Sequence, residues 1–167
     1  RLLREGASYA GIPLDCRTGA EANVTFSGDG SHLAVAAGTL VEDAGWVRVY
    51  RTSDFTGDAT PNPVWTVQGE PGYFFSAVAL SSDGRYVIAG DRVRPHGYGH
   101  PNVPSRLYLW EWEADREIAR PIAHLGSVND IEVSPNGRWI ASGANDGKTK
   151  LWDWNETEHT LEEHLTL

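Results

Sequence analysis

A turn motif that recurs three times at nearly constant spacing constrains the fold of this chain more than any other feature. The pattern Ser-x-Asp/Asn-Gly occurs at residues 27–30, 81–84 and 134–137. Its third residue recurs after 54 residues (83 minus 29) and again after 53 residues (136 minus 83). Asp-Gly and Asn-Gly between apolar segments are strong β-hairpin signals, because these residues accept the positive φ of a tight turn. We therefore expect three copies of one hairpin-based unit.

The residues around each turn indicate four strands per copy. The strand before the turn contains Val24, Val78 or Ile131. The strand after it is apolar on both faces, which is typical of burial between two layers; its copies lie at 33–37, 86–89 and 139–142. A third strand alternates in polarity at 46–50, 107–110 and 150–153. A shorter fourth strand is expected at 13–16, 64–67, 117–120 and 160–163, although residues 155–167 also allow a short amphipathic helix.

Composition and charge narrow the class of protein. Gly and Pro are scattered through every segment, and apolar residues at helical spacing do not persist for three turns, which disfavours helices. The formal charge of -9 opposes a phosphate backbone, so we expect no nucleic-acid partner. The sequence contains neither an apolar run of the roughly 18 residues that a membrane span needs nor a signal peptide, so we expect no membrane partner. The single Cys16 rules out an internal disulfide and favours a cytoplasmic location.

The third copy resembles a WD40 repeat almost position by position. The resemblance rests on AHLGSV at 123–128, SPNG at 134–137, ASGANDG at 141–147 and LWD at 151–153. The first two copies are similar to degenerate WD40 repeats, with quinoprotein-like propeller repeats as the second resemblance. The family fold implies an all-β partial β-propeller of about three four-stranded antiparallel blades. One propeller segment over 1–167 is expected, with blades at about 12–67, 68–120 and 121–167.

The resemblance also implies a structural hydrogen-bonded set in the third copy. The family places it on a His before the first strand, a Ser in the second, an Asp in the following turn and a Trp in the third: His124, Ser142, Asp146 and Trp152. The same Ser, His and Asp types serve in nucleophilic catalysis. We favour the structural interpretation, because the serine lies in a buried strand without a glycine-flanked turn. The sequence therefore predicts no catalytic residues here.

Three blades do not close a ring, because propellers need about four to eight. An open stack leaves apolar faces of its end blades in water. We expect further blades of a longer polypeptide to cover these apolar faces. Ring closure by two or more copies of the chain is the alternative. The absence of methionine favours the first, since it suggests a stretch of a longer chain; a processed or engineered small protein would also lack it.

An insertion at residues 91–105 of the second copy is the candidate partner-binding loop. Loops this long usually have a function or are disordered, and this one carries basic and aromatic residues in an acidic protein: Arg92, Arg94, His96, Tyr98 and His100. A surface loop without a partner is the equal alternative. His96 and His100 lack a helix to align them and a nearby Cys or carboxylate ligand, so we expect no metal site. No cofactor is expected either.

Aromatic residues offer a second candidate contact surface. Tyr73 and Phe74 precede the first strand of the second copy, where the rim of a propeller lies, and they suit either a protein interface or packing between blades. A non-catalytic scaffold for protein–protein interaction is the favoured function. The alternative is part of a quinoprotein-like or other enzymatic propeller whose active site lies outside this segment.

Overall fold

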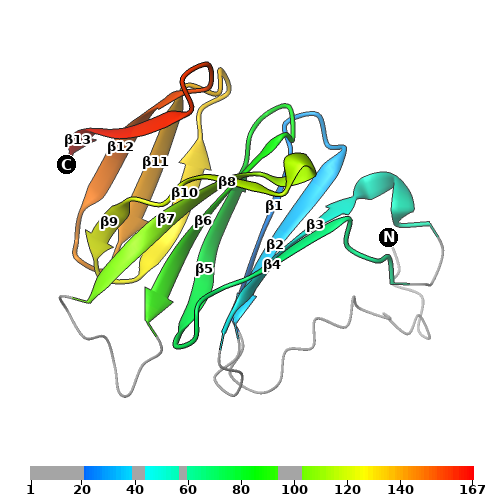
Figure 1. Ribbon diagram of the computed structural model, residues 1–167, viewed down its shortest axis with the longest axis horizontal. Coiled ribbons are helices and arrows are strands. Elements are labelled where there is room, and N and C mark those ends of the chain that lie inside the picture. The colour runs from blue at the N-terminus through cyan, green and yellow to red at the C-terminus, as the bar shows by residue number, and fades with distance from the viewer. Residues whose placement is uncertain (1–20, 39–43, 57–59, 94–102) are drawn as a thin grey trace, which may run out of the picture.

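The computed structural model describes residues 21–38, 44–56, 60–93 and 103–167, which form three antiparallel sheets side by side (Figure 1). Each sheet is built from strands that follow one another along the chain, so each is a meander. No sheet closes on itself among these residues. The expected all-β class and the four-stranded antiparallel units are confirmed.

The strands of each sheet follow in chain order. The first sheet contains β1 (Glu21–Phe26), β2 (His32–Gly38), β3 (Trp46–Arg51) and β4 (Trp65–Gln68). The second contains β5 (Tyr73–Leu80), β6 (Tyr86–Val93), β7 (Pro104–Glu111) and β8 (Arg116–Ala119), and β9 (Ile122–Leu125) also pairs with β7. The third contains β10 (Val128–Val133), β11 (Trp139–Ala144), β12 (Thr149–Asn155) and β13 (Thr160–Thr166). Short 3-10 turns follow β3 and β7, at Thr52–Asp54 and Trp112–Ala114.

The repeated motif forms the same turn in all three sheets. In the second sheet, Ser81 Oγ donates to Asp83 at 2.6 Å and accepts from the backbone N–H of Tyr86 at 2.9 Å. Gly84 follows at a φ of 74°, a left-handed conformation that a side chain would strain. The first and third sheets repeat these contacts with their own residues at the same motif positions.

Apolar side chains fill the spaces between neighbouring sheets. One buried cluster joins the first and second sheets and includes Val47, Val87 and Trp110. Another joins the second and third sheets and includes Ile88, Ile140 and Trp152. The middle sheet is therefore covered on both faces, which is why its second strand is apolar on both sides.

Two segments differ from the expectations at their ends. The insertion predicted over 91–105 is shorter in the structure, because β6 continues to Val93 and β7 begins at Pro104. Arg92 thus lies in a strand paired with Phe74 rather than in a loop, which corrects its predicted placement. The end of the chain forms β13, as favoured over a helix. The strand expected at 13–16 lies outside the described residues.

Candidate functional site

The four residues of the expected structural set meet at the junction between the second and third sheets. His124 lies on β9, which pairs with β7, whereas Ser142 and Trp152 lie on β11 and β12. Trp152 Nε1 donates to Ser142 Oγ at 2.9 Å, and Ser142 Oγ lies 2.8 Å from His124 Nε2. His124 Nδ1 lies 3.2 Å from both carboxylate oxygens of Asp146. The set therefore links two sheets through one chain of contacts.

The directions of these hydrogen bonds follow from the donors available. A carboxylate only accepts, so His124 carries its proton on Nδ1, and its Nε2 accepts from the hydroxyl of Ser142. That hydroxyl in turn accepts from the indole of Trp152, which only donates. Each polar atom in the chain thus has a partner, although three of the four side chains are buried. A fully satisfied buried network of this kind rigidifies a junction.

The electrostatics of the set agree with a neutral histidine. Burial lowers the pKa of His124, against the opposing effect of Asp146. Burial raises the pKa of Asp146. Hydrogen bonds from the backbone N–H groups of Leu125 and Lys148, together with His124, outweigh this effect, so the pKa of Asp146 is lowered overall. At neutral pH the set is therefore a neutral imidazole that donates to an ionised carboxylate.

A Ser–His–Asp order invites comparison with a catalytic triad. Ser142 is 1 % exposed, and its hydroxyl already accepts a hydrogen bond from the indole N–H of Trp152. A nucleophile needs access to a reacting carbon and a free approach, and both are blocked here. The structural role of the set stays a prediction that variants of Ser142 can test.

A second buried polar cluster lies in the second sheet, and sequence reasoning missed it. Asp91 is buried at the end of β6, where its carboxylate accepts the backbone N–H of Arg106 at 2.7 Å and the hydroxyl of Tyr108 at 2.8 Å. Arg106 Nη1 lies 3.7 Å from Asp91 Oδ2 and 3.1 Å from Glu70 Oε2. Burial raises the pKa of Asp91, opposed by these hydrogen bonds and by the guanidinium. The available signal was an acidic residue two positions after the apolar segment at 86–89.

The candidate contact residues divide between strands and undescribed segments. Phe74 is buried, and it fills the space that a Cβ would need at Gly38 or Gly45 of the first sheet. The guanidinium of Arg92 lies 4.2 Å from the Phe74 ring centre. Tyr73 is partly exposed, with the guanidinium of Arg106 5.1 Å from its ring.

The remaining members of the predicted loop lie beyond what the structure describes: Arg94, His96, Tyr98 and His100. The described part of the candidate contact surface is therefore the end of the second sheet at which β5 and β7 begin and β6 ends. Tyr73, Arg106 and Arg120 lie there around Glu70. The carboxylate of Glu70 forms ion pairs with Arg106 at 3.1 Å and with Arg120 at 2.6 Å. We refer to these four residues as the Glu70 edge.

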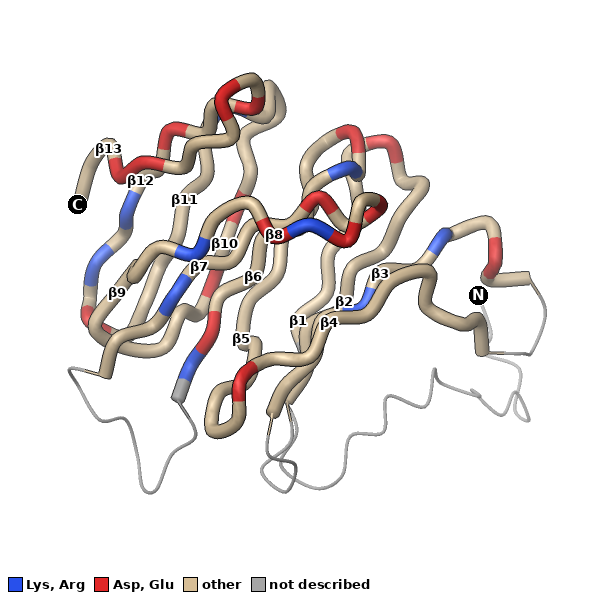
Figure 2. The backbone as a smooth tube through the Cα atoms, in the orientation of Figure 1, with Lys and Arg blue, Asp and Glu red and all other residues tan. Residues whose placement is uncertain are grey.

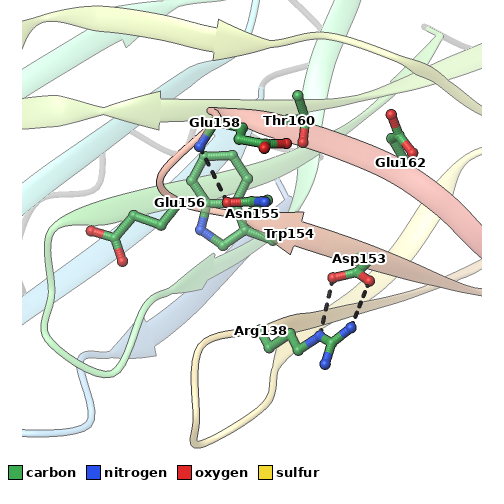
Figure 3. A pocket seen from close by; sticks show the side chains of 8 residues that line it. All are labelled: Arg138, Asp153, Trp154, Asn155, Glu156, Glu158, Thr160 and Glu162. Carbon is green, nitrogen blue, oxygen red and sulfur yellow. Dashed lines mark hydrogen bonds and ion pairs between the residues drawn. The ribbon is translucent and has the colours of Figure 1, made fainter.

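A shallow, polar hollow of about 420 Å³ lies on the third sheet, around the turn between β12 and β13 (Figure 3). Its carboxylates come from Asp153, Glu156, Glu158 and Glu162, and Arg138 binds Asp153 through two nitrogens. A wider hollow of about 680 Å³ lies between the first and second sheets, where Trp65 Nε1 donates to Asp115 at 2.8 Å. No cluster of three metal-ligating side chains occurs within the described ranges.

The family model that matches this chain is the WD domain, G-beta repeat, over residues 116–153. This segment begins at β8, runs through β9 and ends in β12, so it contains the whole hydrogen-bonded set.

Curated relatives are WD-repeat proteins that align over part of the chain. The small ribosomal subunit protein RACK1 of Caenorhabditis elegans is 53% identical over 51 residues, which cover 30% of this chain and 16% of the relative. MST50-interacting protein 11 of Pyricularia oryzae is 41% identical over 51 residues, with the same two shares. The periodic tryptophan protein 2 homolog of Mus musculus is 30% identical over 78 residues, or 47% of this chain and 7% of the relative. The chain thus spans a small part of the length of these relatives.

Among solved structures, hydrazine synthase of Kuenenia stuttgartiensis is similar in fold. The TM-score is 0.60 at 15% identity, and the match covers 82% of this chain and 40% of that chain. A likeness at this identity shows the fold alone. Together with the three open sheets, it agrees with a partial, open β-propeller.

Proposed function

Because residues 116–153 form a WD40 repeat within a partial, open β-propeller, we propose that this chain is a non-catalytic scaffold for protein–protein interactions. The observation that carries the proposal is the repeat itself, whose polar residues are engaged with one another. The polar side-chain atoms of His124, Ser142 and Trp152 all have hydrogen-bond partners within the set. Such an arrangement suits a rigid platform for binding other proteins, with loops at its edge.

The names of two relatives support an interaction role. One is called an interacting protein of MST50, and another is a protein of the small ribosomal subunit, so both are named for assemblies. The similarity extends over 51 residues in each case. We infer that the chain, too, works by binding other proteins.

The Glu70 edge is the described surface that best suits a protein partner. Arg and Tyr side chains are enriched at the energetic centres of protein interfaces. Here Arg106 pairs with Glu70 and Asp91, and its guanidinium lies 5.1 Å from the ring of Tyr73. Four more basic and aromatic residues of the predicted loop follow β6 in the sequence: Arg94, His96, Tyr98 and His100. A partner with an acidic or aromatic contact surface would match this edge.

The test is a photocrosslinking experiment. A benzophenone amino acid replaces Tyr73 in one sample and exposed Phe55 in a matched control, and both are irradiated in native lysate. We expect discrete crosslinked protein bands from position 73 that are absent from position 55. Identical patterns from the two positions, or none from either, would count against the Glu70 edge as a binding surface.

An enzymatic propeller whose active site lies elsewhere is the second candidate. The fold likeness to hydrazine synthase is the observation that favours it, although a match at 15% identity says nothing about chemistry. A bound chromophore would appear in the visible absorption spectrum of the purified protein. A featureless spectrum above 300 nm would weigh against a quinoprotein-like function.

The partner classes expected to be absent stay predictions. The acidic charge of -9 speaks against nucleic acid. In the part of the chain that the structure describes, no helix has the length and apolar character to cross a membrane. The cytoplasmic location likewise stays a prediction.

A further inference from the structure

Four aromatic side chains are in contact at the boundary between the first and second sheets. The ring centre of Trp65 on β4 lies 5.6 Å from that of Trp110 on β7, and Trp110 lies 5.2 Å from Tyr108. The ring planes of Trp110 and Tyr108 are 11° apart, so these two rings are stacked. Phe75 of β5 meets both of them in T-shaped contacts. We refer to Trp65, Trp110 and Tyr108 as the aromatic row.

The aromatic row begins at the protein surface and ends in the interior. Trp65 lines the hollow of about 680 Å³ between the first and second sheets, next to the exposed Thr66 and Asp115. Tyr108, at the other end of the row, is 3% exposed, and Phe75 packs against it. The row therefore connects a hollow that is open to solvent with a site that is shielded from water.

The buried end of the row has a base beside it. The hydroxyl of Tyr108 donates to Oδ2 of Asp91 at 2.8 Å, while the other carboxylate oxygen accepts the backbone N–H of Arg106 at 2.7 Å. Burial raises the pKa of Asp91, so its carboxylate is a stronger base than an exposed one. A proton acceptor for Tyr108 is thus already in place.

Two guanidinium groups flank Tyr108. That of Arg120 lies 4.9 Å from the centre of the tyrosine ring, and Nη1 of Arg106 lies 3.4 Å from its hydroxyl oxygen. Acidic and basic residues lie side by side where β6 ends and β7 begins (Figure 2). Nearby cations oppose a further positive charge on the ring. Tyr108 therefore loses an electron readily only when its proton leaves for Asp91 at the same time.

The order of the residues gives the row a direction. Electron transfer weakens steeply with distance, and contact between neighbouring rings keeps each transfer short. Indole is among the side chains that lose an electron most easily, and a phenol whose proton passes to a base loses one more easily still. Phenylalanine is far harder to oxidise, so Phe75 covers the row without joining it. An oxidised centre formed at Trp65 therefore moves inward to Tyr108.

We propose that the aromatic row is a one-electron relay that carries oxidation from the hollow to Tyr108, an activity separate from the scaffold function. A one-electron oxidant of the metal-complex class at the hollow takes an electron from Trp65. Trp110 then reduces Trp65, and Tyr108 reduces Trp110. The O–H bond of Tyr108 breaks as its electron leaves, and the proton forms an O–H bond at Oδ2 of Asp91. The products are the oxidant reduced by one electron, a neutral tyrosyl radical and a protonated carboxyl group.

The experiment is flash photolysis of the full chain. Cys16→Ser removes the single cysteine, and Thr66→Cys provides one attachment point for a ruthenium polypyridyl sensitiser at the hollow. A laser flash with a soluble electron acceptor converts the sensitiser into the oxidant. We expect a neutral tyrosyl radical, identified by its visible absorption and its electron paramagnetic resonance spectrum. A chain that yields no tyrosyl radical would overturn the proposal.

A pair of tyrosine variants identifies the radical. Tyr108→Phe should abolish the tyrosyl signal and leave a tryptophan radical. Tyr86→Phe is the matched control and should keep the signal. Tyr86 also donates to a carboxylate, that of Glu156 at 3.0 Å, and contacts Trp154, but it lies in the cluster between the second and third sheets. Retention of the signal in Tyr108→Phe, or its loss in Tyr86→Phe, would refute Tyr108 as the end of the relay.

Three tryptophan variants test the route. Trp65→Phe and Trp110→Phe retain an aromatic ring but remove the indole that is oxidised, so each should abolish the tyrosyl signal. Trp112→Phe is the matched control, because Trp112 lines the same hollow but its ring contacts that of His32. Equal yields of tyrosyl radical from the three variants would show that oxidation does not pass along the row.

Asp91→Asn tests the proton transfer. An amide oxygen accepts a hydrogen bond but is too weak a base to take the proton, so the tryptophan radical should persist in place of the tyrosyl radical. The slower formation of the tyrosyl radical that we expect in heavy water should also disappear. An unchanged ratio of the two radicals would refute the role of Asp91. Circular dichroism and the melting temperature show whether each variant is folded before its signal is interpreted.

Discussion

The replacement of Ser142 by alanine is the sharpest test of the hydrogen-bonded set. Two buried groups depend on its hydroxyl: Trp152 Nε1 donates to it at 2.9 Å, and His124 Nε2 lies 2.8 Å away. Alanine removes the partner of both and leaves a small space, and each buried unsatisfied group costs about 1–3 kcal/mol. We therefore expect Ser142→Ala to lower the free energy of unfolding by about 2–4 kcal/mol.

The magnitude depends on the partners rather than on the serine itself. The first and second sheets hold Val35 and Ala89 at the position of Ser142, by the same strand register. An apolar residue is thus compatible with this strand wherever no indole or imidazole points at it. In the background Trp152→Phe, where the donor is gone, Ser142→Ala should cost less, because removing both partners of a hydrogen bond is closer to neutral than removing one.

The assay is urea unfolding followed by tryptophan fluorescence, with Ser53→Ala as the control, because Ser53 is exposed. The control should change the free energy of unfolding by no more than about 0.5 kcal/mol. A loss below about 1 kcal/mol for Ser142→Ala, or the same loss in both backgrounds, would refute the reasoning. Full retention of any catalytic activity in the variant would also exclude a nucleophilic role for Ser142.

Three further predictions follow from single contacts. Because burial lowers the pKa of His124 in the folded chain, the unfolded chain takes up this proton first, so stability is full above the ordinary histidine pKa and falls as pH drops below it. An NMR titration should show His124 titrating below the ordinary histidine range, and a ring that titrates normally would contradict this. Asp91→Ala should lower the free energy of unfolding by about 1–3 kcal/mol, because it leaves the backbone N–H of Arg106 and the hydroxyl of Tyr108 without an acceptor. Asp91→Asn removes a buried charge but keeps an acceptor, so its loss in urea unfolding should be smaller. Equal losses for the two variants would show that the acceptor is not what matters. Gly137→Ala should lower the free energy of unfolding by roughly 1 kcal/mol through backbone strain, and Gly84→Ala should lower it further. Both glycines have a φ of 74°, but only at Gly84 would an added Cβ meet a neighbour, His32 Nδ1 at 2.9 Å. Identical melting temperatures for the two variants would rule out that clash.

Much of the fold was predictable because its signals are local. A Ser-x-Asp-Gly turn sets the positions of two strands through contacts within five residues, as the bonds from Ser81 to Asp83 and from Tyr86 to Ser81 illustrate. The both-sides-apolar second strand then predicted a layer on each side, and the middle sheet has both. The ends of strands were less predictable: β6 runs to Val93 because it is paired with β5, a partner that the composition of residues 91–93 does not announce.

The candidate site was predictable in its third copy and missed in its second. The resemblance to a repeat motif pointed to His124, Ser142, Asp146 and Trp152, and the structure brings all four into one hydrogen-bonded chain. Asp91 belongs to no such motif. Its burial depends on Tyr108 and Arg106, which come from another strand and from a register that only the folded sheet sets.

A resemblance to a repeat motif supplied the residues of one internal network, whereas the sequence by itself determined the repeating unit of this protein, its three turns and the order of its strands. These depend on hydrogen bonds and side-chain alternation over a few residues, which a linear pattern records. The tertiary structure alone decided that His124 lies on a strand of the second sheet while its ring contacts Ser142 of the third, and that Asp91 is buried. Those outcomes depend on which strands pair and which face each row presents, and a shift of one residue in register would have reversed them.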